Sequence, residues 1–376
     1  MSASASRLSP DDDRKLDALL QQVRKARETE MGYPTNADFD YSRLMPFLEF
    51  PLNNCGDPFV PTRFRLNTHD FEREVLKIFA QLTAFPLHES WGYVTNGGTE
   101  GNMYGLFLAR EMLPTGIVYF SEDTHYSVPK ILRCLNMRHI MIRSQPDGRM
   151  DLEDLRETLR LHRDVPPILF ANIGTTVKGA VDDLHGIRKI LRDFAIHQHY
   201  IHADAALSGM ILPFVDHPQP WNREAGADSI SISGHKLIGS PMPCGVVMAR
   251  KAFVDRIARS VEYVGTLDTT LSGSRNGYTP LVLWYAFKSL GLEGFRNRIE
   301  SCLDMAQYAT DRLNELGRHA WRNENSITVV FDKPAEAIVR KWQLATERDI
   351  AHLITVPHVH KEQINGLIQD LRREAS

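Results

Sequence analysis

The chain has 376 residues, of which 43% are hydrophobic and 24% charged, and its formal net charge is -3. This length suffices for one large domain and a smaller one, and the composition is that of an ordinary globular protein. The mixed charges argue against the basic face of a nucleic-acid-binding protein, and no apolar run approaches the length of a membrane span.

The cysteines and the N-terminus indicate where the protein works. Four cysteines lie far apart, with no CxxC pair and no spacing typical of metal ligands: Cys55, Cys134, Cys244 and Cys302. We interpret them as reduced thiols. The first residues, MSASASRLSPDDDRK, contain no apolar signal region, and their three aspartates argue against a transit peptide. We therefore expect a cytoplasmic protein that binds no metal, membrane or nucleic acid.

The first predicted element is a helix over residues 9–28, with Ser9 as its cap and Pro10 in its first turn. Its apolar residues form one stripe, made of Leu16, Leu19, Leu20 and Val23. An irregular stretch rich in proline and asparagine follows over residues 33–66. A second helix is predicted to start near Asn67.

Short apolar runs then alternate with helical patterns. WGYVT precedes a predicted helix over 99–113, IVYF one over 126–136, and PILFANIG one over 183–195. The runs YIHADAA, SISIS and GVVMA complete the set. This alternation predicts an α/β fold with a mostly parallel sheet and helices on both faces.

The pattern changes beyond about residue 285. A long helix containing LVLWYAFKSL leads to a smaller region with one clear strand, SITVVF, and a closing helix. We expect an N-terminal helical arm over 1–56, a large domain over 57–285 and a small C-terminal α/β domain over 286–376.

TNGGTEGN, residues 95–102, joins a predicted strand to a predicted helix. Gly97 and Gly98 allow a tight turn with exposed backbone N–H groups, and Thr99 can cap the helix while its hydroxyl faces an anion. A helix N-terminus of this kind binds phosphate. The alternative is an ordinary glycine-rich turn, and the Gly-Lys-Ser/Thr ending of a P-loop is absent.

YIHADAALSG, residues 200–209, places Asp204 at the end of an apolar strand among alanines. A carboxylate buried there is costly unless a cation meets it, and ligands of open α/β sheets bind at that edge. The alternative is a helix cap or a surface aspartate. His202 suggests a metal pair with Asp204, but no third ligand has a convincing position, so we predict no metal.

SISGHKLIGSPMPCG, residues 231–245, contains a single lysine, Lys236, between His235 and a Gly-Ser-Pro turn. The strand SISIS lies between Asp204 and Lys236, so both can lie at strand ends on the same edge of the sheet. A partly desolvated lysine has a lowered pKa and attacks carbonyls. A simply exposed lysine is the alternative.

His125 follows the strand IVYF, where an imidazole can stack on a flat ring, although a lone histidine is also a common structural hydrogen-bonding residue. A phosphate cradle, a stacking imidazole, a buried carboxylate and a desolvated lysine are together the parts that hold pyridoxal 5′-phosphate. The lysine forms a Schiff base with this cofactor, and the carboxylate keeps its ring nitrogen protonated.

These motifs, in this order, resemble the group II pyridoxal-phosphate decarboxylases of fold type I, the aspartate aminotransferase-like fold. More closely, the chain resembles the bacterial pyridoxal-dependent histidine decarboxylases and the related plant serine decarboxylases. The similarity runs from MGYPTNADFDY to DIAHLITVPHV, nearly the whole chain. Its specific motifs are WGYVTNGGTEGN, THYSV, NIGTTVKGAVDD, HADAALSGM, SGHKLIGSPMPCG and GSRNG.

The resemblance implies a role for each site residue in the large, cofactor-binding domain. Lys236 would form the Schiff base and Asp204 would pair with the pyridinium nitrogen, while His125 would stack on one ring face and Ala206 on the other. The remaining cofactor contacts would come from Gly97, Gly98, Thr99, Ser233 and His235 at the phosphate and from Thr175 near the ring hydroxyl.

The resemblance also implies the reaction, which is α-decarboxylation of an L-amino acid by a carboxy-lyase that works as a homodimer. The segment VEYVGTLDTTLSGS, residues 261–274, resembles the mobile loop that carries the protonating tyrosine, which makes Tyr263 the candidate proton donor. A tyrosine that only packs is the alternative. Active sites at the subunit interface would suit the N-terminal helical arm.

The motifs divide between two substrates. HADAALSGM and ESWGYVTNGGTEGN resemble the histidine branch, whereas Pro58 and Phe59, in the loop that lines the substrate side chain in this family, resemble the serine branch. Tyr278 is a second departure, where GSRNGH is expected. Because more of the chain agrees with the histidine branch, we predict conversion of L-histidine to histamine, with L-serine to ethanolamine as the alternative.

Two further functions use the same residues. A different pyridoxal-phosphate reaction, such as transamination or aldol cleavage, needs the same cradle, and a non-catalytic cofactor-binding protein would keep part of it. The complete catalytic set favours the decarboxylase.

Overall fold

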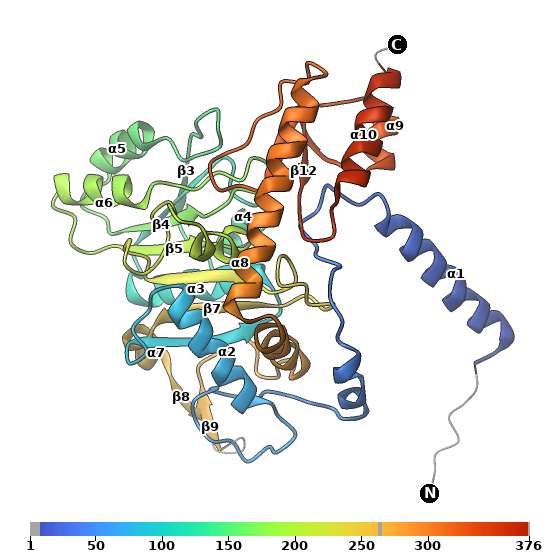
Figure 1. Cartoon of the computed structure of the whole chain (residues 1–376). Helices are drawn as coiled ribbons and strands as arrows, with labels where there is room; N and C mark the ends of the chain where they lie inside the picture. The colour runs from blue at the N-terminus through green and yellow to red at the C-terminus, as the bar shows by residue number, and fades with distance from the viewer. Residues whose placement is uncertain (1–7, 262–264, 375–376) are drawn as a thin grey trace, which may run out of the picture.

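The computed structural model describes residues 8–261 and 265–374, and a seven-stranded sheet lies at its centre (Figure 1). The strands are β1 (Ser90–Thr95), β2 (Ile117–Ser121), β3 (His139–Ile142), β4 (Pro167–Asn172), β5 (Tyr200–Asp204), β6 (Ser229–Ser233) and β7 (Gly245–Arg250). Their order across the sheet is β1-β7-β6-β5-β4-β2-β3. Neighbours from β3 to β6 run parallel, whereas β7 runs antiparallel to β6 and β1. The predicted mostly parallel sheet is confirmed.

Helices cover both faces of this sheet. They are α2 (His69–Leu82), α3 (Gly98–Met112), α4 (Ser127–Cys134), α5 (Leu152–Leu161), α6 (Leu184–Asp193) and α7 (Lys251–Ile257). Alternate residues of β2 face opposite cores, since Val118 and Phe120 pack with α3 and α4 while Ile117 and Tyr119 pack with α5 and α6. Burial on both faces explains why the strands read as continuous apolar runs. Neither β3 nor α5 was predicted from the sequence.

The register of the sheet aligns three strand ends. Asn172 of β4 lies opposite Asp204 of β5, and Asp204 lies opposite Ser231 of β6. The carboxyl ends of these strands therefore share one edge, which is where open α/β sheets bind ligands.

The C-terminal part forms a small domain. Helix α8 (Tyr278–Asn314) kinks at Gly291, which has φ +65°, and crosses the predicted boundary after residue 285. It leads to the antiparallel sheet β10-β12-β11 and two helices. These elements are β10 (Thr328–Asp332), α9 (Glu336–Lys341), β11 (Ala345–Glu347), β12 (Ile350–Ile354) and α10 (Lys361–Glu374). The prediction of one strand is wrong. β11 and β12 form a short hairpin, and the charged turn between them, Arg348-Asp349, interrupts the apolar pattern that predicts strands. The domain boundaries stay a prediction.

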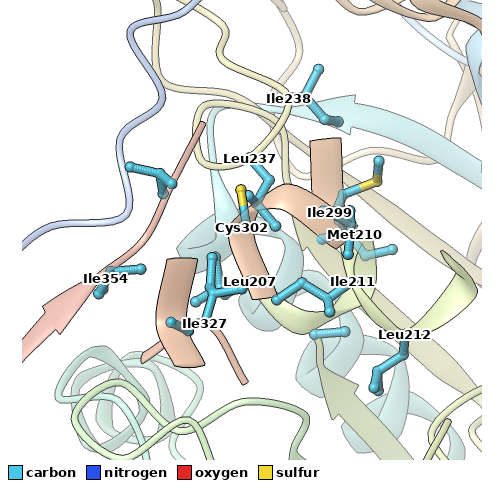
Figure 2. Packing of buried hydrophobic residues seen from close by; sticks show 14 of the residues in the cluster. Leu207, Met210, Ile211, Leu212, Leu237, Ile238, Ile299, Cys302, Ile327 and Ile354 are labelled. Atoms are coloured by element: carbon cyan, nitrogen blue, oxygen red, sulfur yellow. The ribbon is translucent and has the colours of Figure 1, made fainter. Parts of the chain in front are cut away.

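One buried apolar cluster contains residues of both the seven-stranded sheet and the small C-terminal domain (Figure 2). Leu207 and Met210, just after β5, pack in one cluster with Ile299 and Cys302 of α8. Leu237 belongs to the same cluster. The segments that follow β5 and β6 are therefore fixed by apolar packing rather than free to move.

The N-terminal region begins with α1 (Pro10–Arg27), which the hydroxyl of Ser9 caps at the N–H of Asp12. Figure 1 shows α1 projecting away from the body, and the helix buries none of its residues. The eight-residue 3-10 helix η1 (Ser42–Glu49) follows. None of the helices in residues 8–261 and 265–374 combines the length and apolar character needed to span a bilayer.

A two-stranded hairpin, β8 (Arg259–Val261) and β9 (Thr266–Asp268), occupies part of the segment that the sequence analysis treats as a loop over 261–274. Within that segment, the prediction of a loop is therefore wrong for Val261 and for Thr266–Asp268.

Candidate active site

A cavity of about 250 Å³ opens at the carboxyl edge of the sheet. Nine of the predicted site residues line it: Gly98, Thr99, His125, Thr175, Asp204, Ala206, Ser233, His235 and Lys236. They come from five separate segments of the chain, so the fold gathers residues whose proximity the sequence could only suggest.

The turn between β1 and α3 forms one wall of this cavity. Gly97 has φ +130°, which side chains with a Cβ rarely adopt, and it directly precedes α3. A Cβ on Gly98 would lie 3.0 Å from the hydroxyl oxygen of Ser233 and 3.6 Å from the Cβ of Ala206. The first N–H groups of a helix have no intrahelical partner and bind anions. The prediction that Thr99 caps the helix is wrong, because the N-cap residue is Gly97.

Asp204 ends β5 and is only 8% exposed. Its Oδ2 accepts a hydrogen bond of 2.7 Å from the side-chain amide of Asn102, and its Oδ1 accepts one of 3.2 Å from the N–H of Ala206. Both donors hold the carboxylate at the cavity wall. A buried carboxylate in this position is suited to pair with a cation.

Lys236 is half-buried and lies three residues after the end of β6. Burial lowers the pKa of Lys236, and the charge of Asp204 opposes that shift. The lysine's backbone carbonyl accepts from the N–H of Asn36 at 3.3 Å, and the carbonyl of Leu237 accepts from the side-chain amide of Asn36 at 3.0 Å. The backbone is thus fixed, and the lowered pKa makes the amine a better nucleophile.

Two histidines border the cavity. The Nδ1 of His125 accepts from the N–H of Ser127 at 3.3 Å, so the neutral ring carries its proton on Nε2. Burial lowers the pKa of His125, with opposing effects from Asp204, which raises it, and Lys236. The Nδ1–H of His235 donates to the backbone carbonyl of Cys244 at 2.8 Å, and burial also lowers the pKa of His235. Neutral imidazoles of this kind can stack on a ring or donate to an anion.

Five lining residues have no role predicted from the sequence: Asn102, Tyr126, Asn172, Gly174 and Thr176. The amide of Asn172 donates to two hydroxyls and to the buried Asp182, whose pKa burial raises to about 6. A signal for Asn172 was present, because it ends the apolar run PILFAN as Asp204 ends YIHAD. Asn102, inside a helix, carried no comparable signal.

Besides Gly97, three predicted residues are not among those that line the cavity: Pro58, Phe59 and Tyr263. Pro58 is buried, and Phe59 is 43% exposed and lines a separate cavity of about 290 Å³ with His69. Within one chain, the structure does not bring Pro58 or Phe59 to Lys236. Tyr263 lies outside the described residues. The roles of these three residues stay predictions.

The chain is similar to proteins of known activity along almost its entire length. A family model described as "Pyridoxal-dependent decarboxylase conserved domain" matches residues 67–333. A histidine decarboxylase of Morganella morganii is 52% identical over 97% of each chain. A histidine decarboxylase of Pseudomonas entomophila (strain L48) is 50% identical over 98% of this chain and 92% of the relative.

Solved structures show the same fold. L-methionine decarboxylase from Streptomyces sp. 590 superposes with a TM-score of 0.89 at 24% identity, over 99% of this chain and 96% of that one. Glutamate decarboxylase of Lactobacillus brevis CGMCC 1306 superposes with a TM-score of 0.82 at 17% identity, over 100% of this chain and 94% of that one. The predicted type I fold is confirmed.

Proposed function

We propose that this chain, which belongs to the family of pyridoxal-dependent decarboxylases, converts L-histidine to histamine and carbon dioxide. The observation that carries the choice of substrate is the near-full-length similarity to bacterial histidine decarboxylases. The reaction type and the cofactor, pyridoxal 5′-phosphate, follow from the family itself.

The side chains around the cavity fit this cofactor. A helix N-terminus, a buried carboxylate and an amine with a lowered pKa face one space, and Gly98 leaves room against Ser233 that a larger residue would fill. When bound, the cofactor supplies a ring that accepts the electron pair left behind by carbon dioxide.

Two residues would act on the reacting groups. Lys236 would hold the carbonyl carbon of the cofactor through its amine and yield that position to the amine of the substrate. Asp204, oriented by its two N–H donors, would hold a proton on the ring nitrogen. Tyr263 remains our candidate for returning a proton to the substrate carbon.

The remaining residues would bind and orient. The N–H groups at Gly97, Gly98 and Thr99, with Ser233 and His235, would bind the phosphate. The side chains of His125 and Ala206 would contact opposite ring faces. The Thr175 hydroxyl accepts from the N–H of Ala180 at 3.0 Å, so its own proton is available to the ring hydroxyl.

Carbon dioxide release from each of the twenty L-amino acids tests the proposed substrate. We expect cofactor-loaded protein to act on L-histidine with equimolar histamine, and on L-serine about 100-fold less efficiently, because serine leaves an imidazole pocket unfilled. Serine as the sole substrate would contradict this and favour the alternative that Pro58 and Phe59 suggest. Keto-acid products would indicate transamination, and a loaded protein without turnover would indicate a binding protein.

We also propose that two copies associate, with the active sites near their interface. The apolar stripe of α1 is between 47% and 56% exposed and comprises Leu16, Leu19, Leu20 and Val23. Residues in and after η1 are exposed as well, namely Met45, Phe47, Leu48 and Phe50. A second copy would remove this surface from water, which favours association.

The four cysteines are free thiols, which supports the cytoplasmic location that we propose.

Replacing Leu19 and Val23 together with glutamate is expected to convert a dimer to a monomer, because two charges would lie on the apolar stripe of α1. Light scattering after size-exclusion chromatography measures the mass. Leu161→Glu is the matched control, since Leu161 is 76% exposed on α5, away from α1. A monomeric wild-type protein, or a double variant that stays dimeric, would contradict the proposal.

A further inference from the structure

A chain of buried polar side chains runs from Asp204 to the opposite end of β5. Asn102 of α3 bonds to Asp204 at 2.7 Å, and its Oδ1 lies 2.9 Å from the Nε2 of His202. The Nδ1 of His202 lies 2.7 Å from the hydroxyl of Ser229, which accepts from the hydroxyl of Tyr200 at 2.9 Å. Asn102, His202, Ser229 and Tyr200 are each at most 2% exposed.

The chemistry of the groups fixes the direction of every bond. The carboxylate of Asp204 only accepts, so the amide nitrogen of Asn102 faces it and the amide oxygen faces His202. The Nε2 of His202 must then carry a proton, which leaves Nδ1 of the neutral ring to accept from Ser229. Four donors in series thus point toward Asp204, and the first three of them also accept from the next.

Close packing and low polarity keep His202 in this state. A Cβ on Gly105 would lie 2.1 Å from the Nδ1 of His202, and a Cβ on Gly101 would lie 2.2 Å from the hydroxyl of Ser231. These two glycines allow α3 to approach β5 and β6 closely enough for Asn102 to bridge His202 and Asp204. Burial lowers the pKa of His202 to about 3, so its ring is neutral.

We propose that His202 is a positioning residue for the reaction, which acts through Asn102 to fix the direction of the Asp204 carboxylate. The neutral ring, with its single N–H on the Asn102 side, prevents the Asn102 amide from turning its oxygen toward Asp204. Ser229 and Tyr200 fix which ring nitrogen carries the proton. This inference rests on the proposed binding of pyridoxal phosphate, whose ring nitrogen Asp204 would hold protonated.

Two variants of His202 separate positioning from packing. The carboxamide of His202→Gln extends to the place of Nε2 and can still donate to Asn102, whereas the carboxamide of His202→Asn ends near Nδ1 and cannot. We expect His202→Asn to lower kcat per bound cofactor about 10- to 100-fold with KM nearly unchanged, the range seen when residues that orient a ligating group are removed. We expect His202→Gln to recover most of this loss.

The visible absorbance of the bound cofactor gives a readout independent of turnover. In His202→Asn the pH at which this absorbance changes is expected to shift, because a loosened Asp204 holds the ring-nitrogen proton less well. The double variant Asn102→Ala, His202→Asn should shift it no further than Asn102→Ala alone, since His202 acts through Asn102. His352→Asn is the control: His352 is buried on β12, outside the cavity, and burial lowers its pKa to about 4.

Several outcomes would overturn the inference. These are a His202→Asn protein with the kcat and the absorbance pH profile of the wild type, a His202→Gln protein as impaired as His202→Asn, or additive effects in the double variant. If His202→Asn does not fold, Ser229→Ala decides, because it frees the ring of His202 without removing it, and an unshifted absorbance profile contradicts the inference. Wild-type protein that takes up no pyridoxal phosphate would instead contradict the proposed function and, with it, this inference.

Discussion

Lys236→Ala will fold as the wild type does, but it will form no covalent bond to pyridoxal phosphate and will lose decarboxylation. The segment is held by hydrogen bonds from Asn36 to the backbone carbonyls of Lys236 and Leu237, and the side chain of Lys236 takes no part in them. The amine itself is the nucleophile, with a pKa that burial lowers. We expect kcat to fall at least about 10⁴-fold, the scale seen when a covalent catalytic group is removed.

Borohydride reduction followed by mass spectrometry of the intact chain tests this directly. The mass of the wild-type chain should increase by the mass of the attached, reduced cofactor, and the mass of the Lys236→Ala chain should not change. Lys130→Ala is the matched control, because Lys130 is an exposed lysine on α4, close to His125 in the sequence. Its Nζ lies 5.7 Å from the centroid of the Tyr126 ring. A Lys236→Ala protein that keeps the cofactor covalently bound would assign the attachment to another residue.

The sequence predicted the parts of the site that lie where one element meets the next. Strand ends and helix starts leave short local signals: glycines before α3, an aspartate that ends an apolar run, and a lysine between a strand and a proline-containing turn. Because parallel strands align their carboxyl ends, these local signals also predicted that the residues would meet. The cavity that holds Asp204 and Lys236 bears out this step.

The residues that escaped prediction act across long separations. Asn102 contacts Asp204 and His202 from inside α3; it ends the motif TNGGTEGN, but nothing in that motif indicates partners so far along the chain. β11 has only three residues, and β12 lies between β10 and β11, so this small sheet depends on pairing between separated segments of the chain. Such contacts depend on packing in three dimensions, and a single sequence leaves them unmarked.

Another such contact is an ion pair between Glu72 of α2 and Arg275, whose side chains are 0% and 1% exposed. Two guanidinium nitrogens of Arg275 donate to the two carboxylate oxygens of Glu72. Glu72 also accepts from the N–H of Val94 at 2.8 Å and from the side-chain amide of Asn54 at 2.7 Å, and Arg275 donates to the carbonyl of Gly56 at 3.1 Å. The pair thus joins four segments and anchors β1, which leads into the turn at Gly97.

Arg275→Met is expected to lower the free energy of unfolding by about 3–5 kcal/mol, because it leaves the carboxylate of Glu72 buried without a counter-charge. Urea unfolding at one fixed protein concentration measures the loss. Adding Glu72→Gln should recover part of it, since the remaining side chain is then neutral and can still accept from Val94. Lys288→Met removes the half-exposed pair of Lys288 on α8 with Glu74, which like Glu72 lies on α2, and should cost less than about 1 kcal/mol. If Arg275→Met unfolds at the same urea concentration as Lys288→Met, or if Glu72→Gln deepens the loss, the buried pair does not hold these segments together.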